Sequence, residues 1–251
     1  RADRCDVYVP TQGQTVGHMV ATKVSGLPPE KVHIHTTLLG CGLGRRARPD
    51  QIIEAVIASK ASGKPVKVVY TREEDLKTDY FRSAMAHKIK GGLDERNKLI
   101  VWDHKVSSTS LLKHLGRKLK NGIDGYCLWG LWDKPESPVK ANMTYKFPNF
   151  SVNLVLSDLP IPVAPFRSVQ NAPNAFATES FIDEMAHMAR KDPLNFRLES
   201  LTDDKRASRV LESVALNSNW GKPLPKGWGR GIAQHRSFGT SIAEVAEVSV
   251  D

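Results

Sequence analysis

The sequence predicts an α+β fold in which mixed sheets carry packed helices. Residues 5–9 alternate between polar and apolar side chains as a strand does, and residues 15–24 then show the apolar spacing of a helix. Two strand-like segments, 87–91 and 99–107, flank a polar stretch that suits a turn, so we expect an antiparallel pair there. Farther on, the residues that follow Pro173 place apolar side chains on one face of a helix. Strands and helices therefore share the chain.

Composition is that of a globular protein. With 251 residues and 40% apolar content, the chain can bury one large core or two modest ones. Its three cysteines (Cys5, Cys41 and Cys127) are far apart, odd in number and not arranged as a CxxC pair, so neither a disulfide framework nor a zinc site is predicted. No apolar run approaches the roughly 20 residues needed to cross a bilayer. A transmembrane segment is therefore not expected.

The net charge of +9 raises the question of nucleic-acid binding. Basic residues concentrate at 45–48 and at 113–120, but neither run is interleaved with the aromatic side chains that would stack on bases. We therefore expect no nucleic-acid partner, and 113–120 is interpreted as a solvated face. An anionic ligand near Arg45 and Arg46 is the better hypothesis, because glycines precede these two arginines.

The N-terminal region predicts a glycine turn between regular elements. A second strand, 32–39, runs directly into the glycine cluster at 40–44. Asp50 then caps a helix, Gly63 is its expected C-terminal stop, and 65–70 is predicted to be the next strand. Together these segments form a strand, glycine turn, helix and strand, and such a unit can present backbone amides to a phosphate.

The remaining chain is less regular. Residues 109–148 contain scattered glycines and prolines and are predicted to form a long irregular excursion. A strand is expected at 151–157, after which the prolines of 160–165 exclude both helix and central strand. Three helices are expected next: the first begins at Pro173, the second at Asp192 and Pro193, and the third spans 208–218. Two strands are expected after them, at 229–235 and 243–250. Strand-like alternation still runs at the last residues, so we expect the sequence to be part of a longer protein.

Glycine spacing alone leaves the nature of the turn open. Gly40, Gly42 and Gly44 permit positive φ values and close approach of an anion to backbone amides. The dinucleotide fingerprint G-x-G-x-x-G is not met, because its sixth position is Arg45, so a nucleotide-dependent oxidoreductase is disfavoured. A tight turn without a ligand explains the same spacing equally well.

Other residues with possible chemical roles are given structural interpretations. His33 and His35 share a strand face but have no third ligand, so exposed or cross-strand positions are expected. Glu184 and His187 have E-x-x-H spacing in a single copy, and we interpret them as residues of a core helix. No metal ligand set is predicted. The sequence also lacks the G-x-S-x-G, H-E-x-x-H and GxxxxGK[ST] patterns, so common hydrolase, zinc-protease and nucleotide-hydrolase functions have no support.

Several short motifs occur in an order that resembles a known family. They are Pro10-Thr11-Gln12, the segment 26–32, the glycine cluster 40–46, 71–75, 81–84, 166–169, 176–184, Asp192-Pro193 and 229–233. In this order they resemble the molybdopterin-binding part of xanthine dehydrogenase and aldehyde oxidase family large subunits, and within that family the isoquinoline 1-oxidoreductase beta subunit. The resemblance implies the corresponding molybdopterin-binding domain-like fold. It places a first subdomain with the glycine turn at 1–165 and, at 166–251, a helical segment leading into a truncated second region.

The resemblance also implies two groups of site residues. Contacts to the cofactor are expected from Gln12, Gly42, Leu43 and Gly44. Catalytic roles are expected for Arg82 and Arg167, whose guanidinium groups would face the substrate and stabilise developing negative charge. Phe166 and Val169 would help to wall an aromatic substrate. The glutamate that acts as base in this family lies near the far C-terminus and is not among these residues.

By the resemblance, the protein is part of a molybdenum-cofactor-dependent hydroxylase that oxidises an N-heterocyclic aromatic compound or an aldehyde with water as oxygen source. The implied cofactor is molybdopterin, in its cytosine dinucleotide form, with molybdenum. The implied partner is a separate small subunit that carries iron–sulfur clusters. A periplasmic location is implied, with the cytoplasm as the alternative. The 251 residues by themselves are expected to be inactive.

A second hypothesis is a non-catalytic homologue that keeps the fold as a binding or assembly module. Cys41 and Leu43 favour it, because the family usually has glycine and phenylalanine at these positions. Cys41 adds a side chain where the backbone approach is expected to be tight.

Overall fold

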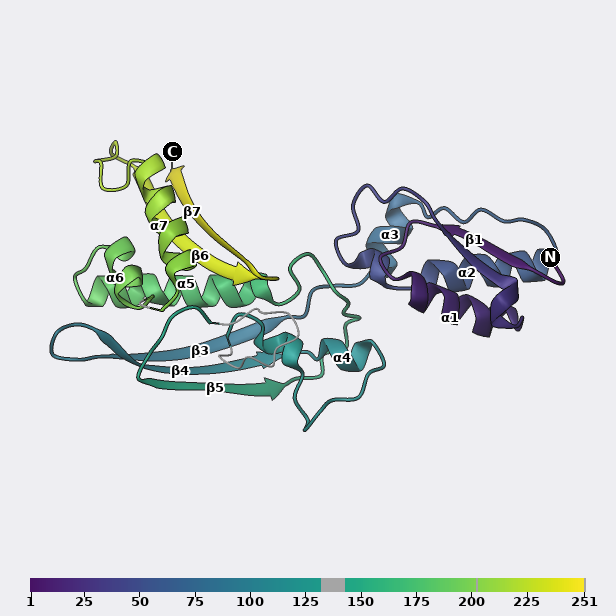
Figure 1. Cartoon of the computed structure of the whole chain (residues 1–251), viewed down its shortest axis with the longest axis horizontal. Helices are drawn as coiled ribbons and strands as arrows, with labels where there is room; N and C mark the ends of the chain where they lie inside the picture. The colour runs from purple at the N-terminus through teal and green to yellow at the C-terminus, as the bar shows by residue number, and fades with distance from the viewer. Residues whose placement is uncertain (132–142, 202, 251) are drawn as a thin grey trace. The chain divides into compact units, whose positions relative to one another are not determined.

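The computed structural model describes residues 1–131, 143–201 and 203–250 (Figure 1). Its strands are β1 (Cys5–Val9), β2 (Val32–Thr36), β3 (Met85–Leu93), β4 (Leu99–Ser108), β5 (Asn149–Leu156), β6 (Trp228–Ser237) and β7 (Thr240–Ser249). Its helices are α1 (Gln14–Ser25), α2 (Asp50–Ser62), α3 (Arg72–Thr78), α4 (Leu111–His114), α5 (Asn171–Met188), α6 (Pro193–Glu199) and α7 (Lys205–Asn217). The predicted α+β class is confirmed.

The chain divides into two compact units. The first consists of Arg1–Arg82 together with Pro160–Val169, and the second of Ser83–Leu159 together with Gln170–Asp251. The first unit is thus built from two stretches of chain that are far apart in the sequence. The division predicted from the sequence, 1–165 and 166–251, rests on resemblance instead of on contacts, and it stays a prediction.

The first unit is organised around the parallel pair β1 and β2. Cys5 lies opposite Val32 and Val9 lies opposite Thr36, and both strands carry apolar side chains toward α1 and α2. The core of the unit consists of Val7, Val9, Ala21, Val32, Ile52 and Val56. Gly63 ends α2 in the left-handed conformation, as predicted. The strand β2 ends three residues earlier than the predicted limit of 39, and Leu38 beyond it is exposed.

The predicted strand at 65–70 is wrong. This stretch has no strand pairing, and Val66, Val68 and Val69 are exposed. Alternating β-branched residues favour an extended backbone, but a strand also needs a neighbour that supplies hydrogen bonds. Among the described residues, none pairs with this segment, so it does not form a strand in spite of its β-strand propensity.

The second unit contains a mixed sheet with helices above it. Strands β3 and β4 pair antiparallel as predicted, and β5 adds parallel to β4. Strands β6 and β7 form a separate antiparallel hairpin. In Figure 1 α5 runs between the three-stranded sheet and this hairpin, and it contacts both β3 and β6. The core cluster formed there includes Trp102, Ile182, Phe196, Leu211 and Ile232.

Caps explain where the C-terminal helices begin. Asp192 accepts a hydrogen bond from the backbone N–H of Asn195 and opens α6 before Pro193, as predicted. The carboxylate of Asp204 does the same for α7 by accepting from Ala207. The predicted excursion at 109–148 is described only in part, because 132–142 lie outside the described residues; the described part contains the single turn of α4 and a 3-10 turn at Gly125–Leu128. Within the described residues, no helix is long and apolar enough to span a membrane.

Candidate functional site

The glycine turn is held against Gln12. The backbone N–H of Gly44 donates a hydrogen bond to Oε1 of Gln12 at 3.0 Å. The backbone N–H of Gln12 and the hydroxyl of Thr11 both donate to the carbonyl oxygen of Arg46, at 3.0 and 3.2 Å. The end of β1 and the glycine turn are therefore one connected structure, although the Gln12 to Gly44 bond spans 32 positions.

At two of the three glycines a neighbouring residue lies too close for a side chain to fit. A Cβ atom on Gly42 would lie 2.5 Å from Cδ of Gln12. Gly44 has a φ of +90°, and a Cβ atom there would lie 2.2 Å from the carbonyl oxygen of Pro165. By contrast, a Cβ atom on Gly40 would meet nothing within 4 Å. Leu43, between Gly42 and Gly44, has a φ of 47° and a partly exposed side chain, so it faces outward from the turn.

The proline-rich segment 160–169 returns to the first unit beside the glycine turn. Phe81 anchors it, because the backbone N–H of Phe81 donates to Pro162 at 2.9 Å and the carbonyl of Phe81 accepts from Ala164 at 3.2 Å. Phe81 and Val163 form an isolated parallel bridge. The absence of a regular element at 160–165 is as predicted. What sequence reasoning missed is that Phe81 and Pro165 bring this segment against Gly44.

The side chain of Arg82 is hydrogen-bonded to the loop 166–169. Its guanidinium donates through Nη2 to the carbonyl of Arg167 at 2.6 Å and through Nη1 to the carbonyl of Val169. The same group lies over the ring of Phe166, with 4.8 Å between Cζ and the ring centroid. Burial lowers the pKa of Arg82 from its ordinary value. The expected catalytic roles of Arg82 and Arg167 remain predictions.

Arg167 differs from Arg82 in its surroundings. Its side chain is exposed and makes no salt bridge or side-chain hydrogen bond to the residues that the structure describes. Half of Phe166 is also exposed. The next two residues, Ser168 and Val169, have φ values of 65° and 53°. A cationic and an aromatic side chain therefore stand on a loop whose backbone turns sharply behind them.

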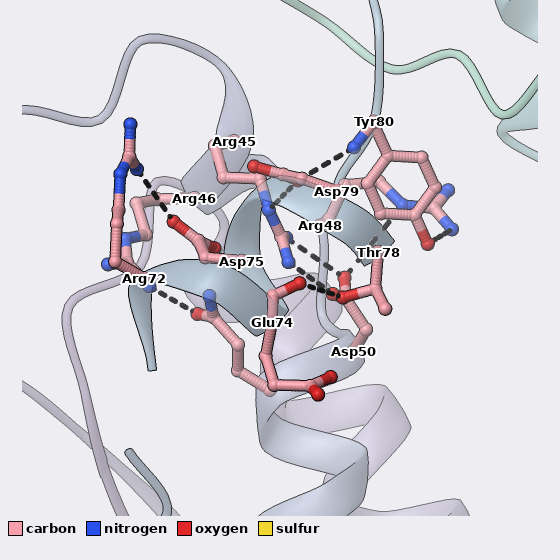
Figure 2. A network of polar contacts seen from close by, with 11 residues as sticks. Arg45, Arg46, Arg48, Asp50, Arg72, Glu74, Asp75, Thr78, Asp79 and Tyr80 are labelled. Carbon is pink, nitrogen blue, oxygen red and sulfur yellow. Dashed lines mark hydrogen bonds and ion pairs between the residues drawn. The ribbon is translucent and has the colours of Figure 1, made fainter. Parts of the chain in front are cut away.

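Arg45 forms ion pairs within the protein (Figure 2). Its guanidinium lies 2.7 Å from a carboxylate oxygen of Asp50 at the start of α2 and 2.5 Å from one of Asp79 just after α3. An anionic ligand at Arg45 would therefore have to compete with the carboxylates of Asp50 and Asp79. Asp79 was missed by sequence reasoning, because an acidic residue 34 positions away gives no local signal.

The two following arginines are also engaged with this network. Arg46 donates to Oε1 of Gln51 at 2.6 Å. Arg48 donates to the hydroxyl of Tyr80 at 3.0 Å and stacks on its ring, 4.6 Å from Cζ to the centroid (Figure 2). The arginine-rich stretch thus fastens the glycine turn to α2 and to the segment that leads into Arg82.

The histidines and Glu184 occupy the structural positions that the sequence predicts. His35 contacts Asp6 on the neighbouring strand at 2.8 Å, so its predicted cross-strand position is confirmed. Glu184 and His187 belong to α5, a helix that contributes Ile182, Met185 and Ala186 to the core cluster, so their interpretation as residues of a core helix is confirmed. Their own side chains are exposed on that helix. Among the described residues, no group of three or more histidine, cysteine, aspartate or glutamate side chains could hold a metal ion.

Comparison with known proteins is consistent with this geometry. Residues 1–112 match the family model of the molybdopterin cofactor-binding domain. Over 247 residues, the chain is 29% identical to isoquinoline 1-oxidoreductase subunit beta of Brevundimonas diminuta, covering 97% of this chain and 31% of that protein. It is 30% identical over 275 residues to the membrane-bound aldehyde dehydrogenase (pyrroloquinoline-quinone) of Gluconacetobacter polyoxogenes, covering 98% of this chain and 34% of that protein. The chain spans about a third of the length of these curated relatives.

Solved structures show the same fold. The aldehyde oxidoreductase of Desulfovibrio gigas matches with a TM-score of 0.71 and 16% identity, covering 92% of this chain and 26% of that chain. Quinoline 2-oxidoreductase of Pseudomonas putida 86 matches with a TM-score of 0.68 and 14% identity, covering 92% and 31%. The fold and the glycine turn define a molybdopterin-binding domain. Residues 1–112 belong to the molybdopterin cofactor-binding domain family, and nearly the whole chain is similar to isoquinoline 1-oxidoreductase subunit beta.

Proposed function

We propose that the chain forms the cofactor-binding part of a molybdenum hydroxylase that oxidises an N-heterocyclic aromatic compound or an aldehyde, with water as the oxygen source. The observation that carries this proposal is the packing of Gln12 into the space above Gly42, with its amide oxygen bound to the N–H of Gly44. The names of relatives that act on isoquinoline and nicotinate, and of an aldehyde oxidoreductase, support the substrate class.

The residues present fit a molybdopterin group. Close backbone approach at Gly42 and Gly44 leaves no side chain between Gln12 and the turn, and the carboxamide of Gln12 is exposed beside it. Gln12 would hold the group through its amide, and the backbone of 42–44 would line one side of it. When bound, the cofactor supplies the two-electron redox chemistry that side chains lack. Arg167, exposed next to Phe166, would stabilise negative charge on an aromatic or aldehyde substrate.

The finer assignments extend the same proposal. We propose the cytosine dinucleotide form of molybdopterin, a small iron–sulfur subunit as electron acceptor, and a periplasmic location. Relatives described as subunits support a multi-subunit enzyme. Co-purification of a tagged chain from its own cells, followed by iron analysis and fractionation, tests the last two. Recovery without iron or from the cytoplasm alone would contradict them.

The cofactor site is tested by measuring the molybdenum and pterin content of two matched glutamine variants. Gln12→Ala removes the carboxamide above the turn, whereas Gln14→Ala removes the exposed carboxamide of the first residue of α1. We expect Gln12→Ala to lower molybdenum and pterin occupancy about tenfold, as at metal sites that lose a residue hydrogen-bonded to a metal ligand. We expect Gln14→Ala to match the unaltered protein. Absence of molybdenum and pterin from the unaltered protein, expressed in cells that make the cofactor, would favour the non-catalytic alternative instead.

A further inference from the structure

The loop 166–169 holds an unfavourable backbone conformation. Ser168 and Val169 both have positive φ values, and this region is especially poor for a β-branched residue such as Val169. Such conformations persist only where the surroundings over-determine them. Within the loop itself, the backbone N–H of Val169 donates to Phe166 at 2.6 Å and the hydroxyl of Ser168 donates to Arg167 at 2.5 Å. These local bonds close the turn.

Arg82 attaches the loop to the segment that precedes β3. Its two terminal nitrogens donate to the carbonyls of Arg167 and Val169, one on each side of Ser168, so a single planar group bridges the turn. Stacking on Phe166 adds a third contact to the same loop. The residue before it, Phe81, already fixes 162–164 through its backbone. Consecutive residues of one segment thus hold the proline-rich stretch and the loop beyond it.

We propose that Arg82 is a positioning residue: it fixes the backbone of the loop 166–169 and thereby determines where the exposed side chain of Arg167 stands. The expected effect of Arg82 on turnover rests on the proposed function, whereas the hydrogen bonds between Arg82 and the loop 166–169 do not. Because the donors of Arg82 are directed at carbonyl oxygens of the loop, its effect on a substrate is exerted through Arg167. Lysine cannot replace it fully, since an ammonium group lacks the planar fork that spans two carbonyls.

Limited trypsin digestion of the purified protein tests the contact without any cofactor. Trypsin cuts after arginine, and the bond between Arg167 and Ser168 carries one of the carbonyls that Arg82 holds. When loop opening is fast relative to cleavage, the cleavage rate follows the population of the open loop. The variants are Arg82→Gln and Arg82→Lys, with Arg72→Gln as control, because Arg72 is an exposed arginine of the same unit.

We expect cleavage after Arg167 to accelerate about tenfold or more in Arg82→Gln, since hydrogen bonds from a charged donor are lost, with a smaller acceleration in Arg82→Lys and none in Arg72→Gln. If Arg82→Gln is not recovered as folded protein, Arg82→Lys carries the test. Cleavage rates equal to those of Arg72→Gln would overturn the proposal.

A double-mutant cycle on turnover of the assembled enzyme tests whether Arg82 acts through Arg167. We expect Arg82→Gln to lower turnover about tenfold alone but to have little effect in an Arg167→Ala background, because the group to be positioned is then missing. Independent, multiplying effects would overturn the positioning role. An enzyme that holds no molybdenum would refute the proposed function, and the digestion result would still decide the contact.

Discussion

Replacing Gly44 by alanine tests whether the segment 160–169 really packs against the glycine turn. The new methyl group would lie 2.2 Å from the carbonyl oxygen and 2.6 Å from the carbonyl carbon of Pro165. Ordinary carbon–oxygen contacts need about 3.3 Å, so the proline backbone has to move by about 1 Å. The left-handed φ of +90° adds roughly 1–2 kcal/mol for a residue with a Cβ. With backbone displacement at a typical overpacking cost, we expect Gly44→Ala to destabilise the first unit by about 2–5 kcal/mol.

Hydrogen exchange is the suitable assay, because it reports each unit separately. All five tryptophans of the sequence fall within the residue ranges of the second unit, so tryptophan fluorescence follows that unit alone; they are Trp102, Trp129, Trp132, Trp220 and Trp228. A destabilisation of about 2 kcal/mol corresponds to roughly thirtyfold faster exchange of amides that open with the first unit. We expect this acceleration in Gly44→Ala, with unchanged tryptophan fluorescence.

Two neighbouring glycines provide graded controls. Gly40→Ala is expected to leave exchange unchanged, because its Cβ would meet nothing within 4 Å and its φ is not positive. Gly42→Ala is expected to fall between the two, because its Cβ would meet Gln12, a flexible side chain that can move. Equal exchange in Gly44→Ala and Gly40→Ala would refute the packing of Pro165 against the turn.

Two further predictions concern the second unit. Arg197 is fully buried and pairs with buried Glu179 at 2.9 Å and with Asp183 at 2.6 Å, so Arg197→Ala is expected to reduce the free energy of unfolding by about 3–5 kcal/mol, measured by urea denaturation with tryptophan fluorescence. A loss below about 1 kcal/mol would contradict the buried pairing. Burial lowers the pKa of His104 to about 4, so between that value and 6.5 the unfolded chain binds more protons than the folded one. Stability should therefore fall by about 2 kcal/mol from about pH 7 to about pH 5 through this residue, and His104→Asn should flatten the dependence; an unchanged slope would remove His104 as its source.

Local features of the fold could be predicted from the sequence, and contacts between distant segments could not. The caps at Asp192 and Gly63 and the apolar spacing of α5 depend on residues close together in the sequence, so helices α6, α2 and α5 could be predicted. The strand at 65–70 failed because pairing depends on a partner that propensity does not specify. Likewise, Arg82 and Val169 stand 87 positions apart, and no local pattern shows that one donates to the other.

The candidate site was predicted as a set of residues, and the structure supplies their relations. Gln12 and Gly42 were expected near one cofactor, and they do contact each other directly. Arg82 and Arg167 were expected to play the same role, yet the first donates to the backbone of the second, and only the second is exposed. Two arginines to which the resemblance gives one role are therefore separable by experiment: Arg82 positions the loop, and Arg167 is the side chain that the loop presents.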